Sequence, residues 1–311
     1  MEITTEIKEK LADALDRYIE DNELTQTQAA KLTGVNAAYL IQIKRRDFTI
    51  NSGGKAIPIA DRYFRAIADT IDFPLEKVYW ETRPTMQTKE ILAHLADAKK
   101  NAEPVVIIGE TGSGKSYTAE LFRRKHPIDT FIVKVGSTDN LRDLLDKVLA
   151  HFDVPFKVLT RTGMINQIIW HMNRLRQQGY NPQLLFDEAE YLNVYALCAW
   201  KELFDNLNNV CSLGLIGTDQ LIEKLDKLRM RNKAGIPQLY RRIKYRIRKI
   251  TPIDRTYRAF ITDYPVPLQK WLKANCDNYG ELHDVMETAL READRTGKEL
   301  NEDFVKLVLG I

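Results

Sequence analysis

The stretch Val105-Val106-Ile107-Ile108-Gly109-Glu110-Thr111-Gly112-Ser113-Gly114-Lys115-Ser116 decides the fold of this chain. Its β-branched start predicts a strand, the pattern G-x-x-x-x-G-K-S follows at once, and residues 117–122 continue as a helix. The glycines allow several backbone N–H groups to converge on phosphate oxygens at the positive end of that helix. Strand, loop and helix together favour a nucleotide site over a Gly-rich turn without a ligand.

Two side chains of this loop carry most of the predicted chemistry. Lys115 supplies a mobile positive charge for the β- and γ-phosphates, and the Ser116 hydroxyl is predicted to coordinate Mg²⁺. The expected ligands are therefore ATP and Mg²⁺. The rest of the predicted phosphate-binding loop consists of Gly109, Glu110, Thr111, Gly112, Ser113 and Gly114.

A second motif lies at Gln183-Leu184-Leu185-Phe186-Asp187-Glu188-Ala189-Glu190, an apolar strand that ends in adjacent carboxylates. In P-loop enzymes the first carboxylate holds Mg²⁺, and a following glutamate can polarise the attacking water. We assign Asp187 to the metal and Glu188 to general-base catalysis. The alternative is a strand that ends in a solvated acidic turn. Glu190 is expected to be a solvated residue at the start of a helix.

Length and composition limit the classes of protein. A chain of 311 residues predicts two or three domains, and a net charge of only +3 means that nucleic-acid binding requires local clusters of cations. Cys198, Cys211 and Cys276 are widely spaced and odd in number, which is typical of buried thiols in a reducing cytoplasm. The charged start and the absence of a long apolar run predict a soluble cytoplasmic protein with no membrane partner.

Residues 1–80 have the pattern of a small helical domain. After an amphipathic helix with Ile7, Leu11 and Leu15, two short helices are expected at 25–32 and 36–44, with Thr33-Gly34-Val35 as the turn. The spacing of Ala30, Gly34, Val35, Leu40 and Ile43 is typical of a helix-turn-helix. A further helix with Tyr63, Phe64, Ile67 and Ile71, followed by Leu75, Val78 and Trp80, is expected to close the domain.

The second helix of this pair is predicted to face DNA. Its expected outward side chains suit base edges and phosphates, although an αα-hairpin that only packs is the alternative. Ala37 accompanies the predicted DNA-binding residues, which are Asn36, Tyr39, Gln42, Lys44 and Arg45.

The pattern breaks at residues 81–85, where we place a linker. A helix at 86–100, predicted to lie beside the adenine, precedes the phosphate loop. Strands at 131–135, 183–187 and 213–217 then alternate with helices at 141–152 and 164–177 and with a helix that contains Leu197 and Trp200. Such alternation predicts a parallel sheet with helices on both faces. The predicted domains are 1–80, 81–250 and 251–311.

Gly217-Thr218-Asp219 follows the strand at 213–217 and is expected beside the γ-phosphate, because ligands bind at the carboxyl ends of such strands. Thr218, or less directly Asp219, would orient the attacking water. The alternative is a simple cap for the helix at 221–228.

The densest run of cations lies between residues 224 and 249, and no acid occurs between Asp226 and Asp254. A solvated face, contacts to DNA phosphates and an arginine finger for a neighbouring subunit are the three open interpretations. The predicted phosphate contacts are Lys224, Lys227, Arg229 and Arg231. Residues 251–311 show helices around 257–261, 268–275, 282–291 and 304–309, which is the helical lid arrangement of the AAA+ class.

The order of these parts resembles the MuB family of transposition target-selection ATPases, relatives of TnsC and IstB, over nearly the whole chain. The more particular likenesses are the helix-turn-helix, Gln87-Thr88-Lys89, Gly217-Thr218-Asp219 and Gln238-Leu239-Tyr240-Arg241-Arg242-Ile243. The resemblance implies an ATP-dependent protein that binds double-stranded DNA without sequence preference and assembles on it as a helical homo-oligomer. It also implies a cognate transposase that receives the target DNA and is stimulated.

Several residues take roles by position in this resemblance. Arg242 matches the candidate arginine finger, with Arg241 as the near alternative, and Thr218 stands where the family often has a longer polar sensor. His283 stands where a lid arginine is expected. Two other functions remain open: a helicase-loader-like ATPase, and a transcriptional regulator whose helix-turn-helix binds an operator while the nucleotide domain acts as a switch.

Overall fold

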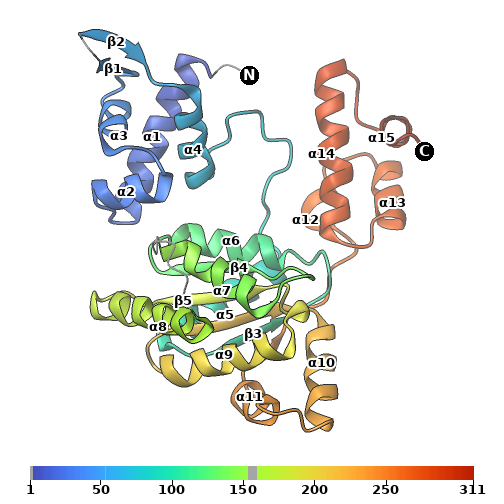
Figure 1. Cartoon of the computed structure of the whole chain (residues 1–311). Helices are drawn as coiled ribbons and strands as arrows, with labels where there is room; N and C mark the ends of the chain where they lie inside the picture. The colour runs from blue at the N-terminus through green and yellow to red at the C-terminus, as the bar shows by residue number, and fades with distance from the viewer. Residues whose placement is uncertain (1–2, 53, 153–159) are drawn as a thin grey trace. The chain divides into compact units, whose positions relative to one another are not determined.

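The computed structural model describes residues 3–52, 54–152 and 160–311, and the chain divides into two compact units (Figure 1). The first unit comprises residues 1–78 with 124–128, and the second comprises 79–123 with 129–311. Within the described ranges, no helix has both the length and the apolar character needed to cross a lipid bilayer. Each unit has its own hydrophobic core.

The first unit is a small helical domain with the predicted helix-turn-helix. Thr25 caps the first short helix through a reciprocal capping box with Gln28, and Gly34 ends it with a left-handed φ of 63°. Leu40 and Ile43 are fully buried against the neighbouring helices, as the spacing predicted. The helices are α1 (Thr5–Asp21), α2 (Gln26–Thr33), α3 (Ala37–Lys44) and α4 (Asp61–Ile71).

Two features of this unit differ from the prediction. An antiparallel hairpin of β1 (Thr49–Ser52) and β2 (Lys55–Pro58) follows α3 and was not predicted, because short exposed strands have no buried alternation to reveal them. The expected closure by Val78 and Trp80 was wrong. Val78 is 54% exposed, and Trp80 packs in the C-terminal helical core of the second unit.

The second unit is built on a five-stranded parallel sheet in the order β4-β5-β6-β3-β7. The order places β6 between the strand before the phosphate loop and the strand that ends in Asp187. The strands are β3 (Val105–Ile108), β4 (Thr130–Lys134), β5 (Gln183–Asp187), β6 (Ser212–Gly217) and β7 (Ile247–Lys249). The last strand was not predicted; it lies inside the basic run and pairs with β3.

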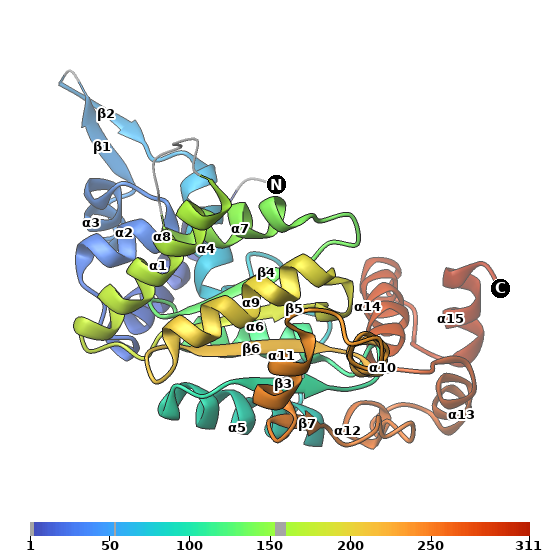
Figure 2. The ribbon, with the colours of Figure 1, turned by 60° about the horizontal axis from the view of Figure 1, so that its bottom comes forward.

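Helices cover both faces of this sheet, as predicted (Figure 2). One face packs on α5 (Met86–Asn101) and α6 (Lys115–Lys125). The other face packs on a larger core, whose helices are α7 (Leu141–Leu149), α8 (Arg161–Gln177), α9 (Val194–Leu207), α10 (Asp219–Met230) and α11 (Ile236–Ile243). Two short 3₁₀ turns, η1 (Ala150–Phe152) and η2 (Ala189–Tyr191), follow α7 and β5.

The C-terminal residues form a separate helical core around Tyr257, Leu268 and Met286. This is the predicted lid, and the described part of the chain beyond residue 250 contains no strand. Its helices are α12 (Arg258–Ile261), α13 (Val266–Asn275), α14 (Tyr279–Thr296) and α15 (Glu302–Leu309).

Candidate functional site

The phosphate loop has the backbone conformation that its glycines predict. Gly112 and Gly114 have left-handed φ values of 72° and 83°, which residues other than glycine rarely adopt. A Cβ atom on Gly112 would also collide with the side chain of Asn278 from the lid. Helix α6 begins at Lys115, so its free N–H groups face the loop. The loop thus presents backbone donors at a positive helix end, as an anion site requires.

Lys115 lies almost fully buried within this loop. Its Nζ atom donates to the carbonyl oxygens of Gly109, at 2.8 Å, and Glu110, at 2.7 Å. Burial lowers the pKa of Lys115, while the carboxylates of Glu190, Asp187 and Glu110 act in the opposite direction. The ammonium group is therefore held by weak neutral acceptors and is available to a stronger anionic partner.

The other predicted loop residues surround the same position. Ser113 is buried and donates from its hydroxyl to the Glu110 carbonyl at 2.7 Å, while Thr111 and Ser116 are exposed to the cavity. The Glu110 side chain pairs with Arg255, from the segment leading into the lid, at 2.6 Å. An ion pair therefore connects the loop to the lid side of the site.

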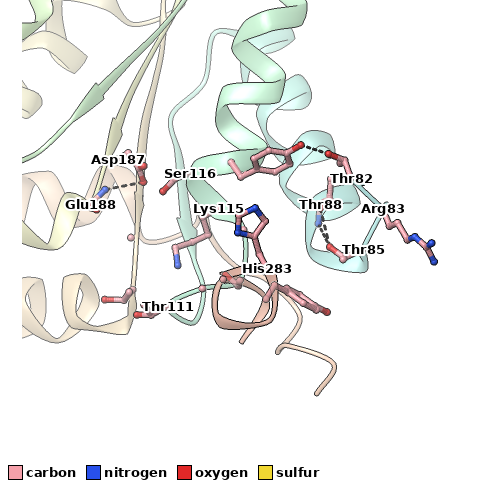
Figure 3. Close-up of a pocket in the computed structure, with 18 of the residues that line it drawn as sticks. Thr82, Arg83, Thr85, Thr88, Thr111, Lys115, Ser116, Asp187, Glu188 and His283 are labelled. Atoms are coloured by element: carbon pink, nitrogen blue, oxygen red, sulfur yellow. Dashed lines mark hydrogen bonds between the residues drawn. The ribbon is translucent and has the colours of Figure 1, made fainter. Parts of the chain in front are cut away.

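Asp187 and Ser116 supply oxygen ligands that suit Mg²⁺. Asp187 ends β5, is 5% exposed, and accepts a hydrogen bond from the Glu188 backbone N–H at 2.9 Å. Figure 3 shows the Ser116 hydroxyl on the side of the loop that faces Asp187. A hard cation prefers such a hydroxyl and carboxylate set, completed by phosphate and water oxygens. The described ranges contain no group of three or more His, Cys, Asp or Glu side chains that could hold a metal ion by themselves.

Glu188 adopts a strained backbone conformation, and its carboxylate pairs with one cation. Its φ of 55° is in the left-handed region, which is uncommon outside glycine and is often found at functional sites. Its carboxylate pairs with Lys134 at 3.1 Å. Lys134 ends β4 directly beside Asp187 in the sheet register, so neighbouring strands position this pair.

Thr218 follows β6, between the other two strand ends. Its hydroxyl donates to Glu190 at 3.2 Å and makes no cap hydrogen bond, although Thr218 occupies the N-cap position of α10. The backbone N–H of Gly109 donates to the Gly217 carbonyl at 3.2 Å, which joins the phosphate loop to this strand end. We call the carboxyl ends of β3, β5 and β6, with the phosphate loop, the nucleotide-binding edge.

The expectation that Glu190 is solvated was wrong. One carboxylate oxygen accepts from Thr218, and the other is buried without a hydrogen-bond partner in the described chain. Glu190 also lines the cavity with Lys115 and Asp187. The sequence did not reveal this role, because a carboxylate in a turn is usually solvated. The one feature that could have indicated it is the position of Glu190 two residues after Glu188.

A cavity of about 670 Å³ joins these residues to the lid. Its far side carries the aromatic rings of Trp80 and Phe260, stacked with centroids 4.9 Å apart, and the ring of His283 meets Trp80 edge-on at 5.5 Å. Thr82, Thr85 and Thr88 line the same side before and at the start of α5, and His283 lines the cavity from α14. The volume and the mixed lining suit a nucleotide with its base against the rings.

The predicted DNA-binding residues at α3 differ in their exposure and in their contacts within the protein. Asn36 caps the helix by accepting from the Ala38 N–H at 2.8 Å, and Lys44 pairs with Asp16 at 3.3 Å. Tyr39 packs edge-on against the Tyr63 ring, with centroids 4.8 Å apart. Gln42 is half-buried, and Arg45 is exposed. Ile41, which the prediction omitted, is 40% exposed on this helix.

The segment 224–249, called the basic segment below, is largely paired within the molecule. Lys224 is half-buried and donates to the Glu190 carbonyl at 2.9 Å; burial lowers its pKa, opposed by the Glu190 charge. Lys227 lies 3.8 Å from Glu223, and Arg229 lies 3.1 Å from Asp226. Three further pairs reach distant carboxylates: Arg242 with Asp205 at 2.6 Å, Arg246 with Glu103 at 2.6 Å, and Lys249 with Asp219 at 2.6 Å.

Few cations of the basic segment remain open to a partner. Arg231, Lys233, Arg241 and Lys244 are exposed and make no ion pair with any residue that the structure describes. Arg242, the residue that the family resemblance favours as a finger, lies on α11 beside α9 and also approaches the Phe204 ring, with its guanidinium carbon 5.8 Å from the centroid. Arg241 is its free neighbour.

Comparisons with known proteins agree with this geometry. Residues 96–225 match the family model of the AAA domain. A protein of Haemophilus influenzae, described as Mu-like prophage FluMu DNA transposition protein B, is 24% identical over 266 residues, which cover 84% of this chain and 85% of the relative. A crystal structure of Cdc6p from Pyrobaculum aerophilum is similar with a TM-score of 0.51 at 16% identity, covering 74% of this chain and 67% of that one. The chain has the P-loop AAA+ fold with a helical lid, and it resembles the MuB-type DNA transposition proteins.

Proposed function

We propose that this protein is a Mg²⁺-dependent ATPase whose ATP-bound form assembles on double-stranded DNA and delivers that DNA to a transposase. The observation that carries the ATPase proposal is the convergence of the phosphate loop, Asp187, Glu188 and Thr218 on one cavity. The transposase is proposed from the name of the H. influenzae relative.

The chain's own residues divide the work of hydrolysis. Lys115 would leave the two loop carbonyls for the phosphates, and Ser116 and Asp187 would hold Mg²⁺, which neutralises charge that develops on the phosphoryl oxygens. Glu188 would accept a proton from the attacking water once released from Lys134, and Thr218 would help to orient that water. Because Glu188 is paired and Thr218 is engaged by Glu190, slow turnover is expected in the absence of DNA.

Two surfaces support the DNA proposal. In the first unit, Gln42 lies on the second helix of a helix-turn-helix and Arg45 caps its end; this helix is the element that enters a major groove in such domains. In the second unit, Lys227, Arg229 and Arg231 are exposed on α10 and just after it. Phosphate contacts of this kind give affinity without sequence preference.

Assembly is proposed from the same geometry. An arginine finger must reach a neighbour's nucleotide, and α11 presents Arg241 and Arg242 beside each other. Arg242 would exchange Asp205 for the phosphate of a neighbouring subunit, whereas Arg241 makes no ion pair with the described residues that it would have to break. A helical homo-oligomer on DNA follows if each subunit supplies a finger to the next, because a head-to-tail contact that does not close generates a filament.

A transcriptional regulator is the second candidate, favoured by the complete hydrophobic core of the helix-turn-helix unit. Gel-shift measurements separate the two functions. Random duplexes of increasing length and duplexes selected for binding are compared with and without ATP. The proposed function predicts binding that requires ATP, ignores sequence and tightens with length. Nucleotide-independent binding to one selected sequence would favour the regulator.

A further inference from the structure

Glu190 holds a carboxylate at the nucleotide-binding edge that the reaction above does not use. One oxygen, Oε1, accepts from the Thr218 hydroxyl at 3.2 Å. The other, Oε2, is buried and has no hydrogen-bond partner among the described residues. A buried acceptor without a donor is costly, so a native structure retains one only where another demand is met.

The neighbouring strand is shaped to accept this carboxylate. A Cβ atom on Gly217 would lie 2.5 Å from Glu190 Oε2, so any residue larger than glycine would displace the side chain. Gly217 is buried at the end of β6, and η2 packs against that strand. The carboxylate therefore fills a space that glycine leaves at the strand end.

Glu190 also holds helix α10 at two points. Its side chain engages Thr218, the N-cap residue of α10, and its backbone carbonyl accepts from the Lys224 ammonium at 2.9 Å. Lys224 lies about 1.7 turns beyond Thr218. One residue of η2 thus fixes both the start and the middle of the helix that carries Lys227 and Arg229.

Bound phosphate changes the electrostatic environment of this carboxylate. Glu190 is the foremost of the carboxylates that act on Lys115, ahead of Asp187 and Glu110, and it lines the same cavity. A triphosphate on the loop would bring negative charge into that cavity and engage Lys115. Like charges in a partly buried site repel strongly, and Glu190 lacks the second donor that would anchor it.

We propose that Glu190 is a positioning residue that couples the bound triphosphate to helix α10, by changing its contact with Thr218 and the position of η2 beneath Lys224. ATP thereby alters the placement of the exposed cations at the end of α10, whereas ADP, which lacks the γ-phosphate charge, does so less. This coupling is the regulatory part of the proposed ATP-dependent DNA binding and rests on it. A ligand can shift an equilibrium only through such a difference between states.

Hydrogen–deuterium exchange of the full-length protein tests the coupling without DNA and without turnover. Wild type and Glu190→Gln are measured with and without a non-hydrolysable ATP analogue and Mg²⁺. Glutamine keeps the size and one acceptor oxygen but removes the charge. In wild type we expect the analogue to slow amide exchange in the phosphate loop and at the start of α6. We also expect it to change the amide exchange rates of α10 by about fivefold or more. In Glu190→Gln we expect the same loop protection and little response in α10.

Two sets of variants separate coupling from general damage. Glu223→Gln alters an exposed carboxylate of the same helix, 3.8 Å from Lys227, and should respond as wild type does. Thr218→Val, which lacks the donor, should lose the α10 response, while Thr218→Ser should keep it. A full α10 response in Glu190→Gln, or an equal loss in Glu223→Gln, would overturn the coupling. Absence of loop protection in wild type would instead overturn the ATPase proposal.

Discussion

The nucleotide-binding edge and the basic segment are both rich in charge but use it in opposite ways. At the edge, Lys115, Asp187 and Glu190 face one cavity, and two of them lack a full set of strong partners. In the basic segment, Arg242, Arg246 and Lys249 are neutralised by carboxylates of distant elements.

The charges of the nucleotide-binding edge are available to a ligand, whereas those of the basic segment mainly stabilise the fold. Arg246, directly before β7, pairs with Glu103, directly before β3, and so joins the starts of these two paired strands. Surface pairs of this kind contribute little individually, but they occupy cations that a count of charges would assign to DNA. Only Arg231, Lys233, Arg241 and Lys244 are left exposed without an ion pair in the described part of this segment.

The largest expected effect concerns the arginine finger. The test decides which arginine of α11, Arg242 or Arg241, is the finger. If Arg242 serves, Arg242→Ala should bind ATP normally but lose about 10³-fold in turnover at high protein concentration. Activity should return in a mixture with Lys115→Ala, because one partner supplies the finger and the other an intact loop. Steady-state ATPase assays over a range of protein concentrations measure this. If Arg241→Ala alone loses the concentration dependence, the free arginine is the finger.

A second test concerns Glu188. Glu188→Gln removes the proton acceptor and keeps the size of the side chain, so turnover should fall by about 10²-fold or more while nucleotide affinity stays unchanged. DNA-bound assemblies should persist longer in a dissociation assay. Glu202→Gln, on an exposed position of α9, is a suitable control. Wild-type turnover in Glu188→Gln would remove Glu188 from the mechanism.

A third test compares the two DNA surfaces. Neutralising Lys227, Arg229 and Arg231 should weaken ATP-dependent DNA binding and flatten the slope of log affinity against log salt by about one unit per lost contact. Neutralising Lys224 should act mainly through the position of α10, because its ammonium is held by the Glu190 carbonyl. Removal of residues 1–78, which keeps Trp80 in the nucleotide cavity, should leave weaker ATP-dependent binding. An unchanged salt slope in the first variant, with no binding by the truncated chain, would move DNA contact to the helix-turn-helix.

The smallest expected effect concerns Lys134. This ammonium pairs with Glu188 across neighbouring strands, and the bond raises the pKa of Lys134. Lys134→Ala should free the Glu188 carboxylate and raise DNA-independent turnover about two- to fivefold, as expected for a partly exposed pair. Lys134→Arg should keep the ion pair with Glu188 and therefore the wild-type turnover. Equal or lower turnover in Lys134→Ala would show that the pair does not limit hydrolysis.

Local sequence was sufficient where local geometry decides the structure. The loop glycines, the apolar run before Asp187 and the Thr25 and Gly34 helix ends each carry their own backbone requirement, so the P-loop sheet and the helix-turn-helix followed from the sequence. The lid followed from helical periodicity in the same way.

Long-range packing decides what the sequence did not reveal. Strand β7 consists of only Ile247, Arg248 and Lys249, which show no strand pattern of their own, so its pairing with β3 makes it a strand. Glu190 gains its role from Gly217 and Thr218, 27 and 28 residues further along the chain, and Trp80 finds its stacking partner in Phe260. The pairing of the basic segment likewise depends on carboxylates that lie far away in sequence.

Electron microscopy of the protein with random-sequence DNA and a non-hydrolysable ATP analogue tests the central claim most directly. The account predicts regular helical filaments on DNA of any sequence, absent when the analogue is omitted and absent for Lys115→Ala, whose loop lacks its phosphate-binding charge. Isolated particles at one DNA sequence, or filaments that form equally well with Lys115→Ala, would contradict it.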